Sequence, residues 1–492
     1  MAAARRRKTE AERAQVLDLK AAREHLRAFE GAKQSRRTEG WLTSNKGPNA
    51  DLKPALRWLI QRSQDLYDSD PWIHRAVEVI VSNTIGTGIE GAPVGGTKAF
   101  GAAYQEWASS TECDFYGRAN LFGLQELAMR TVVNRGSVLV RKRVEPRMAD
   151  QGMVPLQLQV MEPDWLDATQ DNGQDIMGGK RFDQWGRWIS AFLYDQHPGE
   201  SGISASRLTS TEVPVSELLH VYEDQRPGRY TGVPWGASVL LRARDLADYE
   251  SAEILKQKLA ACFAGFVVEL DAETEAEGDD LTETIEPGLL QRLKSGQDIR
   301  FSDPPKVEGY GAFSTQQLRA IAVGYGITYE ALTGDLSGVN FSSGRMGWLE
   351  FQRNLSRWQW NMLVPQMLDP IGRWYRDLAG MVAPSRVPRR MTWTPPRREM
   401  IQPKEEIQWL TDAVRAGFMT LSEVQRSFGF VPSDLLDELA EDLKGARERR
   451  LVLAVDMSRD PQHLFAVQNG AAEPTGDGEG QGGSTAQGDD PS

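Results

Sequence analysis

The sequence is poor in the residues that build most catalytic and metal centres. Only two cysteines, Cys113 and Cys262, occur among 492 residues, and they form no C-x-x-C pair. A disulfide framework and a cysteine zinc site are therefore excluded, and a reducing compartment is the natural setting. The five histidines are scattered, so we interpret each as a surface or core residue rather than a ligand or general base: His25, His74, His197, His220 and His463.

The sequence also lacks the motifs of nucleotide and hydrolytic chemistry. It contains no G-x-x-x-x-G-K-[ST] segment to hold a nucleotide phosphate and no H-E-x-x-H metal helix. It contains no G-x-S-x-G nucleophile elbow either. We therefore predict that the chain is not an enzyme and that it binds neither a cofactor nor a metal.

Long hydrophobic runs are absent as well. The longest is about ten residues, from Leu259 to Val268, whereas a membrane-spanning helix needs about 20. The first residues, MAAARRRKTEAERAQ, have no apolar core behind their charges, so we expect no secretory signal and no membrane partner.

What the chain has is an uneven acidic charge. Lysine and arginine number 57 and acidic residues 69, a net charge of −12, which disfavours a free-standing DNA binder. Residues 1–40 carry eleven basic and six acidic side chains, and predict a basic, partly helical N-terminal arm. Residues 466–492 hold seven glycines, five acids and no basic residue, and predict a disordered acidic tail.

Hydrophobic periodicity predicts an α+β chain. Helical spacing covers 51–86, with Asp70-Pro71 as a helix start, and a glycine-rich loop is expected from 85 to 96. A period of two then predicts a strand-rich region at 130–225. Its strands are expected at 132–144, 156–160, 188–194 and 218–222.

Two long helical stretches, 237–263 and 345–378, flank a small insert with strands at 266–270 and 298–301. Pro365 and Pro370 are expected to kink or interrupt the second stretch. Its tryptophans favour core packing over base stacking. Further helices are expected at 315–332, 403–416, 420–428 and 433–450.

Four segments resemble the lambda-type portal proteins of bacteriophages, over about residues 50–450. They are GKRFDQWGRW at 179–188, RPGRYTGVPW at 226–235, LRAIAVGYGITYEALTGDLSGVNFSSGR at 318–345 and PKEEIQWLTDAVRAGFMTLSEVQRSFGF at 403–430. The third is the most specific, since Asp335, Leu336, Ser337, Asn340, Phe341, Ser342, Ser343 and Arg345 fit the family phrase position by position. Phe341 and Thr328 stand where the family more often has Tyr and Pro.

The resemblance implies an α+β portal fold with long stem helices, a strand-containing wing, a small clip and a helical C-terminal crown, assembled as a ring of twelve subunits. The implied parts are a basic N-terminal arm (1–40), the wing (41–236), a stem helix (237–263), an acidic clip (264–313), a second stem helix (314–333), a tunnel loop (334–344), a long kinked helix returning to the wing (345–402), the crown (403–465) and the tail (466–492).

The resemblance further implies a ring at one capsid vertex of the virion, assembled in the host cytoplasm. Terminase would package DNA through this channel, DNA would later be ejected through it, and head-completion and tail proteins would dock on it. The implied partners are the protein itself, the terminase large subunit, major capsid and scaffold proteins, adaptor proteins and non-specific double-stranded DNA. One alternative is a ring-forming head protein with no role in DNA translocation; another is a head enzyme, for which no motif is present.

Two groups of residues are the candidate sites. The channel loop would contact DNA through Ser337, Asn340, Ser342, Ser343 and Arg345; Arg345 could instead pair with Asp335, which we favour because a cation at a helix N-terminus needs a compensating acid. The clip would offer Glu269, Asp271, Glu273, Glu275, Glu283 and Glu286 to a basic partner. The run from 269 to 286 has nine acids and no basic residue, so it could equally be a solvated surface.

Overall fold

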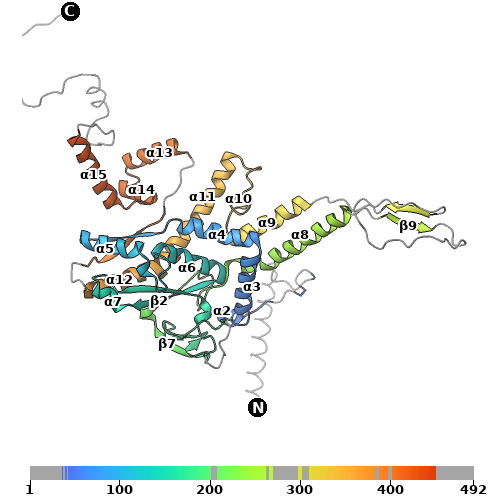
Figure 1. Ribbon diagram of the computed structural model, residues 1–492, viewed down its shortest axis with the longest axis horizontal. Helices are drawn as coiled ribbons and strands as arrows, with labels where there is room; N and C mark the ends of the chain where they lie inside the picture. The colour runs from blue at the N-terminus through green and yellow to red at the C-terminus, as the bar shows by residue number, and fades with distance from the viewer. Residues whose placement is uncertain are drawn as a thin grey trace, which may run out of the picture.

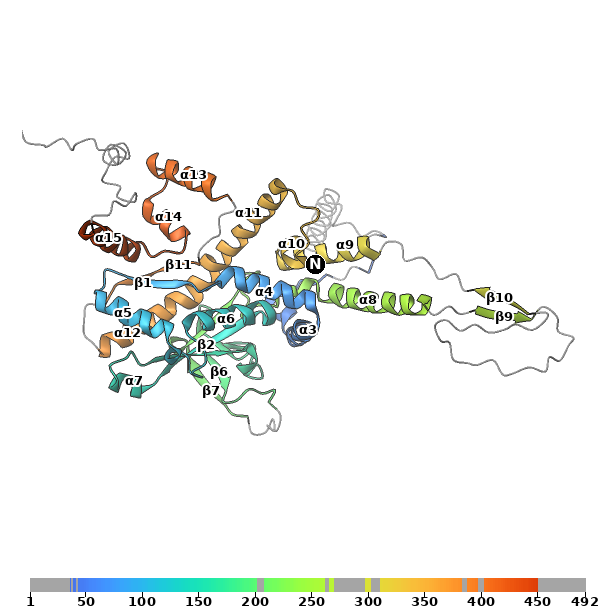
Figure 2. The ribbon, with the colours of Figure 1, turned by 45° about the horizontal axis from the view of Figure 1, so that its top comes forward.

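The computed structural model describes residues 43–200, 208–261, 265–269, 297–301, 310–382, 387–396 and 402–449, together with Arg36, Glu39 and Gly40. The predicted acidic tail lies outside these residues, as does nearly all of the predicted basic arm. The described chain consists of a mixed body, a long projection that leaves it on one side, and a C-terminal group of helices (Figures 1 and 2).

One layer of the body is helical. It contains α3 (Leu56–Ser69), α4 (Pro71–Ile85), α5 (Lys98–Ser109) and α6 (Leu121–Arg135). The body also has two short helices, α2 (Pro48–Leu52) and α7 (Pro146–Asp150). Helix α4 begins where predicted, because Asp70 Oδ1 accepts hydrogen bonds from the backbone N–H groups of Trp72 and Ile73, both at 2.9 Å. Ile73 and Ile80 are fully buried, and α4 and α6 lie at the centre of the main core.

A three-stranded antiparallel sheet packs beneath these helices in the order β3 (Leu156–Met161), β2 (Ser137–Val144), β8 (Leu218–Tyr222). Val138 and Val140 belong to the main core, whereas Leu139 belongs to a second core on the other face. The prediction of a strand from residue 132 is wrong: α6 continues to Arg135. Val132 and Val133 are fully buried in that helix, which ends at Gly136 with a φ of 89°.

A second antiparallel sheet covers the other face of the first, in the order β4 (Ile176–Met177), β5 (Lys180–Phe182), β6 (Trp188–Tyr194), β7 (Ser210–Pro214). Ala191, Leu193 and Val213 join Leu139 and Leu218 in the second core. Short 3-10 helices lie at Thr111–Cys113, Pro163–Trp165, Val215–Glu217 and Trp235–Ser238. The predicted strands at 156–160, 188–194 and 218–222 are present, to within one residue.

A two-stranded sheet joins β1 (Glu90–Val94) to β11 (Arg390–Thr394). The prediction of a loop from 85 to 96 is therefore wrong for its second half. The two strands lie about 300 residues apart in the chain, with Gly91 opposite Trp393. Local glycine content suggested a loop, but pairing with the distant strand β11 supplies the hydrogen bonds that make residues 90–94 a strand.

The projection is an antiparallel pair of helices, α8 (Leu240–Ala261) and α9 (Tyr310–Tyr325), with the hairpin β9 (Gly265–Glu269) and β10 (Gln297–Phe301) at its far end (Figure 2). The rings of Tyr249 and Tyr310 stack with centroids 6.1 Å apart. Arg242 Nη1 donates to Gln317 Oε1 at 2.5 Å, nearer the body. The helix predicted to reach residue 333 is split, since α10 (Tyr329–Thr333) starts after Gly326, whose φ is 71°.

The long helix predicted at 345–378 contains a π-helical segment in its middle. Helix α11 (Phe341–Trp358) continues into the π-helix η7 (Gln359–Leu368) and then into α12 (Asp369–Val382). Pro365 lies inside η7, and Pro370 is the second residue of α12, just after the junction of the two. Trp358 and Trp374 are buried, as core packing requires, whereas Trp360 is 47% exposed.

The C-terminal helices are α13 (Pro403–Arg415), α14 (Leu421–Ser427) and α15 (Pro432–Glu448), each starting within one residue of its predicted position. These helices and the turns between them leave several large apolar side chains exposed, namely Ile407, Trp409, Phe418, Leu421, Phe430 and Leu436. Within the residues described, no helix combines the length and the apolar character needed to cross a bilayer.

Candidate functional site

The connection between α10 and α11 is the candidate channel loop, and it is shorter than predicted. Residues 334–340 lie between the helices, and all but Val339 are exposed. Asp335 Oδ1 accepts a hydrogen bond from the backbone N–H of Ser337 at 3.0 Å. Hydrogen bonds from the side chain and backbone of Ser337 hold the pKa of Asp335 below its usual value. The loop is thus a turn that its own polar groups organise.

Asn340 and Ser343 form the N-terminal cap of α11. Asn340 Oδ1 accepts from the N–H of Ser343 at 2.8 Å, and Ser343 Oγ accepts from the N–H of Asn340 at 3.2 Å. This reciprocal capping box satisfies two donors that a helix start leaves unpaired. Residues 341–344, predicted as loop, are therefore the first helical turn, and the exposed Ser342 lies within it.

Arg345 does not pair with Asp335, so this part of the prediction is wrong. Its Nη1 donates to Gln402 Oε1 at 3.4 Å, at the start of α13. The Asp335 carboxylate instead bonds to Ser337 and to the hydroxyl of Tyr329, at 3.4 Å. Hydrogen-bond donors of the turn and of Tyr329 compensate the Asp335 carboxylate, and Arg345 is an exposed residue.

The surroundings of the loop offer little fixed charge. Arg319 lies over the Tyr329 ring, 5.4 Å from its centroid, and Arg345 is one turn along α11. Leu336 and Met346 are exposed by 67% and 69%. The tip of α11 therefore presents short polar groups and two apolar side chains, which suits weak, reversible contact better than ion pairing with a polyanion.

The Cys113 thiol and one cluster of possible metal ligands can be examined among the described residues. Burial raises the pKa of the Cys113 thiol to about 12, which makes it unreactive. Glu162, Asp164 and His197 come together with ligand atoms within 4.8 Å. However, Arg135 forms ion pairs with Glu162 at 3.1 Å and Asp164 at 2.8 Å, so the carboxylates are already compensated.

Comparison with known proteins decides the family. The model of the family described as "Phage portal protein, lambda family" matches residues 34–359, about two thirds of the chain. The chain belongs to this family. It is a portal protein, and as such a structural protein and not an enzyme.

The chain is also similar to a curated relative and to solved structures. The chain is 24% identical over 458 residues to the "Probable portal protein" of Halomonas phage phiHAP-1, covering 85% of this chain and 86% of that one. It is similar to a chain in the neck of a native gene transfer agent particle, with 14% identity, a TM-score of 0.47 and coverage of 78% and 95%. It is also similar to an HK97 family phage portal protein from Corynebacterium diphtheriae, with 9% identity, a TM-score of 0.32 and coverage of 58% and 84%.

The second predicted site of this portal protein falls mostly outside the described structure. Glu269 is the last residue of β9, and its side chain is not described. Asp271, Glu273, Glu275, Glu283 and Glu286 lie outside the described residues. The acidic surface for a basic partner therefore stays a prediction.

Sequence reasoning missed Lys180 and His220 of the portal protein, which lie buried between its two sheets. The alternation in β8 carried the signal, because Leu218, His220 and Tyr222 share the face that meets the second sheet. His220 was interpreted as a surface or satisfied core residue. It is in the core, but neither of its ring nitrogens has a hydrogen-bond partner.

Proposed function

We propose that this portal protein forms a closed ring of twelve subunits at one capsid vertex, and that DNA enters and leaves the head through the ring. The observation that carries the proposal, beyond family membership, is the α8–α9 projection. It leaves Leu241, Ile254 and Val323 exposed by 72%, 55% and 77%. Neighbouring projections packed side by side would cover these side chains, and a heterologous contact that closes produces a ring.

The charge of the chain supports a channel along which DNA slides. Twelve copies with a net charge of −12 each carry −144. Lysine and arginine along the path would pair with phosphates and hold the duplex. In the proposed ring, the loop at 334–340 and the exposed first turn of α11 face the channel, where Ser337 and Ser342 make brief hydrogen bonds to DNA and Arg345 supplies one cation per subunit.

The remaining parts supply docking surfaces. The hairpin β9–β10, with the acidic segment that joins its strands, is the clip and meets the terminase large subunit, and later the head-completion and adaptor proteins. Helices α13–α15 form the crown. The body is the wing, which contacts major capsid and scaffold proteins. The ring is assembled in the host cytoplasm and remains in the virion.

The experiment adds charge to the proposed channel without deleting the helix cap. Heads are assembled with the double variant Ser337→Lys and Ser342→Lys, and with Ser109→Lys on the exposed surface of α5 as the control. Rings form in each case, but the double variant packages DNA more slowly and releases it less completely, because new cations hold phosphates. The measurements are packaging rate, DNA length per head and infectivity. If the double variant matches the control in all three, the loop does not contact DNA, and a ring without a translocation role becomes the better description.

A further inference from the structure

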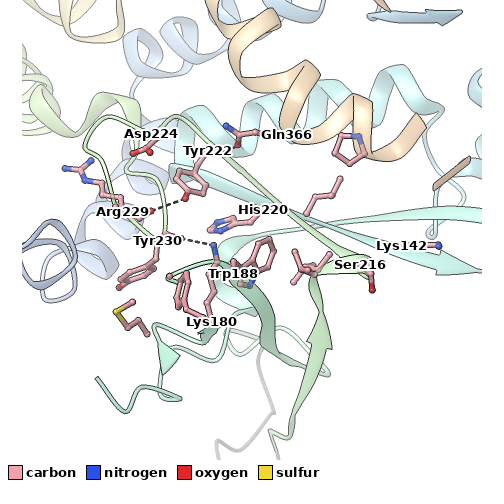
Figure 3. A pocket seen from close by; sticks show the side chains of 18 of the residues that line it. Lys142, Lys180, Trp188, Ser216, His220, Tyr222, Asp224, Arg229, Tyr230 and Gln366 are labelled. Carbon is pink, nitrogen blue, oxygen red and sulfur yellow. Dashed lines mark hydrogen bonds between the residues drawn. The ribbon is translucent and has the colours of Figure 1, made fainter. Parts of the chain in front are cut away.

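A cavity of about 950 Å³ lies between the two sheets of the body (Figure 3), and no residue of the proposed channel loop lines it. The strands β5, β6 and β8 form its inner wall, and residues from η7 and α12 complete it. Its size falls in the range of small-molecule sites in proteins, about 300–1,000 Å³. Aromatic side chains make up much of the wall, among them Trp188, Tyr222, Tyr230 and Trp374.

Lys180 carries a charge into this cavity without a counterion. Its side chain is almost fully buried, with 3% of the residue exposed. Its Nζ donates one hydrogen bond, to the carbonyl oxygen of Tyr230 at 2.8 Å, and lies 4.5 Å from the centroid of the Trp188 ring. Within the described residues it forms no ion pair with a carboxylate. An ammonium has three N–H donors, so two of them have no acceptor in the protein.

His220 adds an unsatisfied imidazole beside it. The residue is 7% exposed, and neither Nδ1 nor Nε2 has a hydrogen-bond partner. Burial, and then the nearby Lys180 charge, hold the pKa of His220 well below its usual value, so the ring is neutral at neutral pH. A neutral imidazole has one N–H donor and one acceptor. Figure 3 shows His220 and Lys180 converging on the same space, with Trp188 beside them.

We propose that this cavity binds a small organic anion. Its carboxylate or phosphate oxygens accept hydrogen bonds from Lys180 Nζ and from the N–H of His220, and its apolar body packs against Trp188 and Tyr222. The ligand would supply the counter-charge and the hydrogen-bond acceptors that the protein does not provide for Lys180 and His220. A buried charge or donor without a partner costs free energy, so binding would relieve that cost.

This site is independent of DNA translocation and adds a function to the wing. The ligand would bridge β5 and β6 of one sheet to β8 of the other, and Gln366 of η7 already accepts a hydrogen bond from the N–H of Tyr222 at 3.0 Å. Binding would therefore stabilise the body where the sheets meet the long helix. A neutral ligand, a water-filled cavity and a closed cavity are the competing descriptions.

Calorimetric titration of the purified full-length protein tests the ligand class. The probes are benzoate, phenyl phosphate, inorganic phosphate and the uncharged benzamide, all at one ionic strength. Benzoate and phenyl phosphate should bind with a Kd of about 1 mM or lower, as good ligands of their size do. Inorganic phosphate should bind more weakly, because it leaves the aromatic wall unused, and benzamide should not bind measurably. Binding of benzamide as tight as that of benzoate, or no binding of either aromatic anion, overturns the proposal.

Variants locate the binding in the cavity. Lys180→Met keeps the shape of the side chain and should weaken benzoate binding by about tenfold or more, the loss expected for a charge-assisted hydrogen bond. His220→Phe should weaken it less. Lys142→Met is the matched control, because Lys142 also lines the cavity and in Figure 3 its amine points away from Lys180. An equal loss in the control and in Lys180→Met would place the anion elsewhere.

A chemical readout does not depend on the stability of any variant. Acetic anhydride acetylates an uncharged amine: the Nζ–carbon bond forms, acetate leaves, and the amine loses a proton to the buffer. Burial lowers the pKa of Lys180 to about 7, so the amine is available at pH 8. Peptide mass spectrometry should find acetylated Lys180, and benzoate should protect it but not Lys142. Lack of protection, or no reaction at Lys180 even without benzoate, contradicts the proposal.

Discussion

At the scale of single residues, Gly136 allows α6 to end close to the backbone of residues 233–234. It ends α6 with a φ of 89°, and a Cβ there would lie 2.5 Å from the carbonyl carbon of Val233 and 2.7 Å from the nitrogen of Pro234. Gly136→Ala should lower the free energy of unfolding by about 3 kcal/mol, from left-handed strain and a backbone clash together.

The control for this change is Gly173→Ala. Gly173 has a φ of 68°, but nothing lies within 4 Å of its missing Cβ. Only the left-handed conformation is penalised there, so the loss should be about 1 kcal/mol. Chemical denaturation of the two variants measures both values. Equal losses would show that the contact of Gly136 with the 233–234 backbone does not contribute.

Lys180 gives a residue-scale prediction about pH. Burial lowers its pKa from 10.5 to about 7 in the folded protein. Between these values the unfolded chain binds more protons, so this group makes stability increase with pH across that window. Below pH 7 its full penalty is present. Lys180→Met removes the group, and its thermal midpoint should exceed that of the wild type most at pH 7 and below.

The measurement is the difference in thermal midpoint between Lys180→Met and wild type from pH 6 to pH 10. It should shrink steadily as the pH rises from 7 to 10, while the difference for Lys142→Met stays level. His220 is the neighbouring titratable group that senses the Lys180 charge, and it is neutral throughout this window. A difference that does not change with pH would mean that Lys180 is not desolvated in solution.

At the scale of elements, hydrophobic periodicity predicted the helices and strands that form from local sequence alone. The helix at 237–263 and the strands at 188–194 and 218–222 appear within three residues of their expected bounds, since each contains its own repeating pattern. Two predictions failed because non-local contacts override local composition. Strand β1 exists through its pairing with β11, and Val132 and Val133 are helical because α6 buries them in the main core.

The end of the candidate loop, where α11 starts, could not be predicted from local composition either. Glycine, serine and asparagine content located the connection, but the start of α11 depends on a capping box with Ser343 at the third position. Glutamate or glutamine is the usual signal there. The cavity could not be predicted from the sequence, because Lys180 and His220 lie 40 residues apart and meet only when two sheets pack together.

The π-helix η7 supports an element-scale prediction. Gln359 at its start is 6% exposed, and its Nε2 donates to the carbonyl oxygen of Thr84 at 2.7 Å. Thr84 is in the last turn of α4, where carbonyls lack helical partners. Gln359→Leu should leave this buried carbonyl unpaired and cost about 1–3 kcal/mol of unfolding free energy.

Hydrogen exchange shows where the loss falls. In Gln359→Leu, protection should decrease at the end of α4 and in η7, and stay unchanged in α13–α15. Gln408→Leu, on the exposed face of α13, is the matched control and should change the unfolding free energy by no more than about 0.5 kcal/mol. If both variants unfold alike, Gln359 does not act as a cap for α4.

At the scale of the whole molecule, the projection is the part that a single subunit stabilises least. The inner end of α8 is anchored, since Leu240, Ala243 and Leu246 are buried in the main core. Farther out, Ile254 and Leu255 are exposed by 55% and 57%. Helix α9 packs along the inner half of α8, since its first residue, Tyr310, stacks on Tyr249. The outer half of α8 extends beyond α9 in Figure 2, so the apolar face there needs a second subunit to leave water.

The charge substitutions Ile254→Asp and Leu255→Asp, made together, should therefore prevent ring formation without unfolding the body. A carboxylate cannot be buried unpaired between projections, and the inner anchor of α8 is untouched. Light scattering should give 12 × 54.8 = 657.6 kDa for the wild type and a mass near 54.8 kDa for the variant. The control removes the exposed ion pair of Arg244 and Asp248, 3.4 Å long, by changing both to Ala, and should still form rings because exposed pairs contribute little. Rings in the aspartate variant would show that the wing or the crown, and not the projection, holds the subunits together.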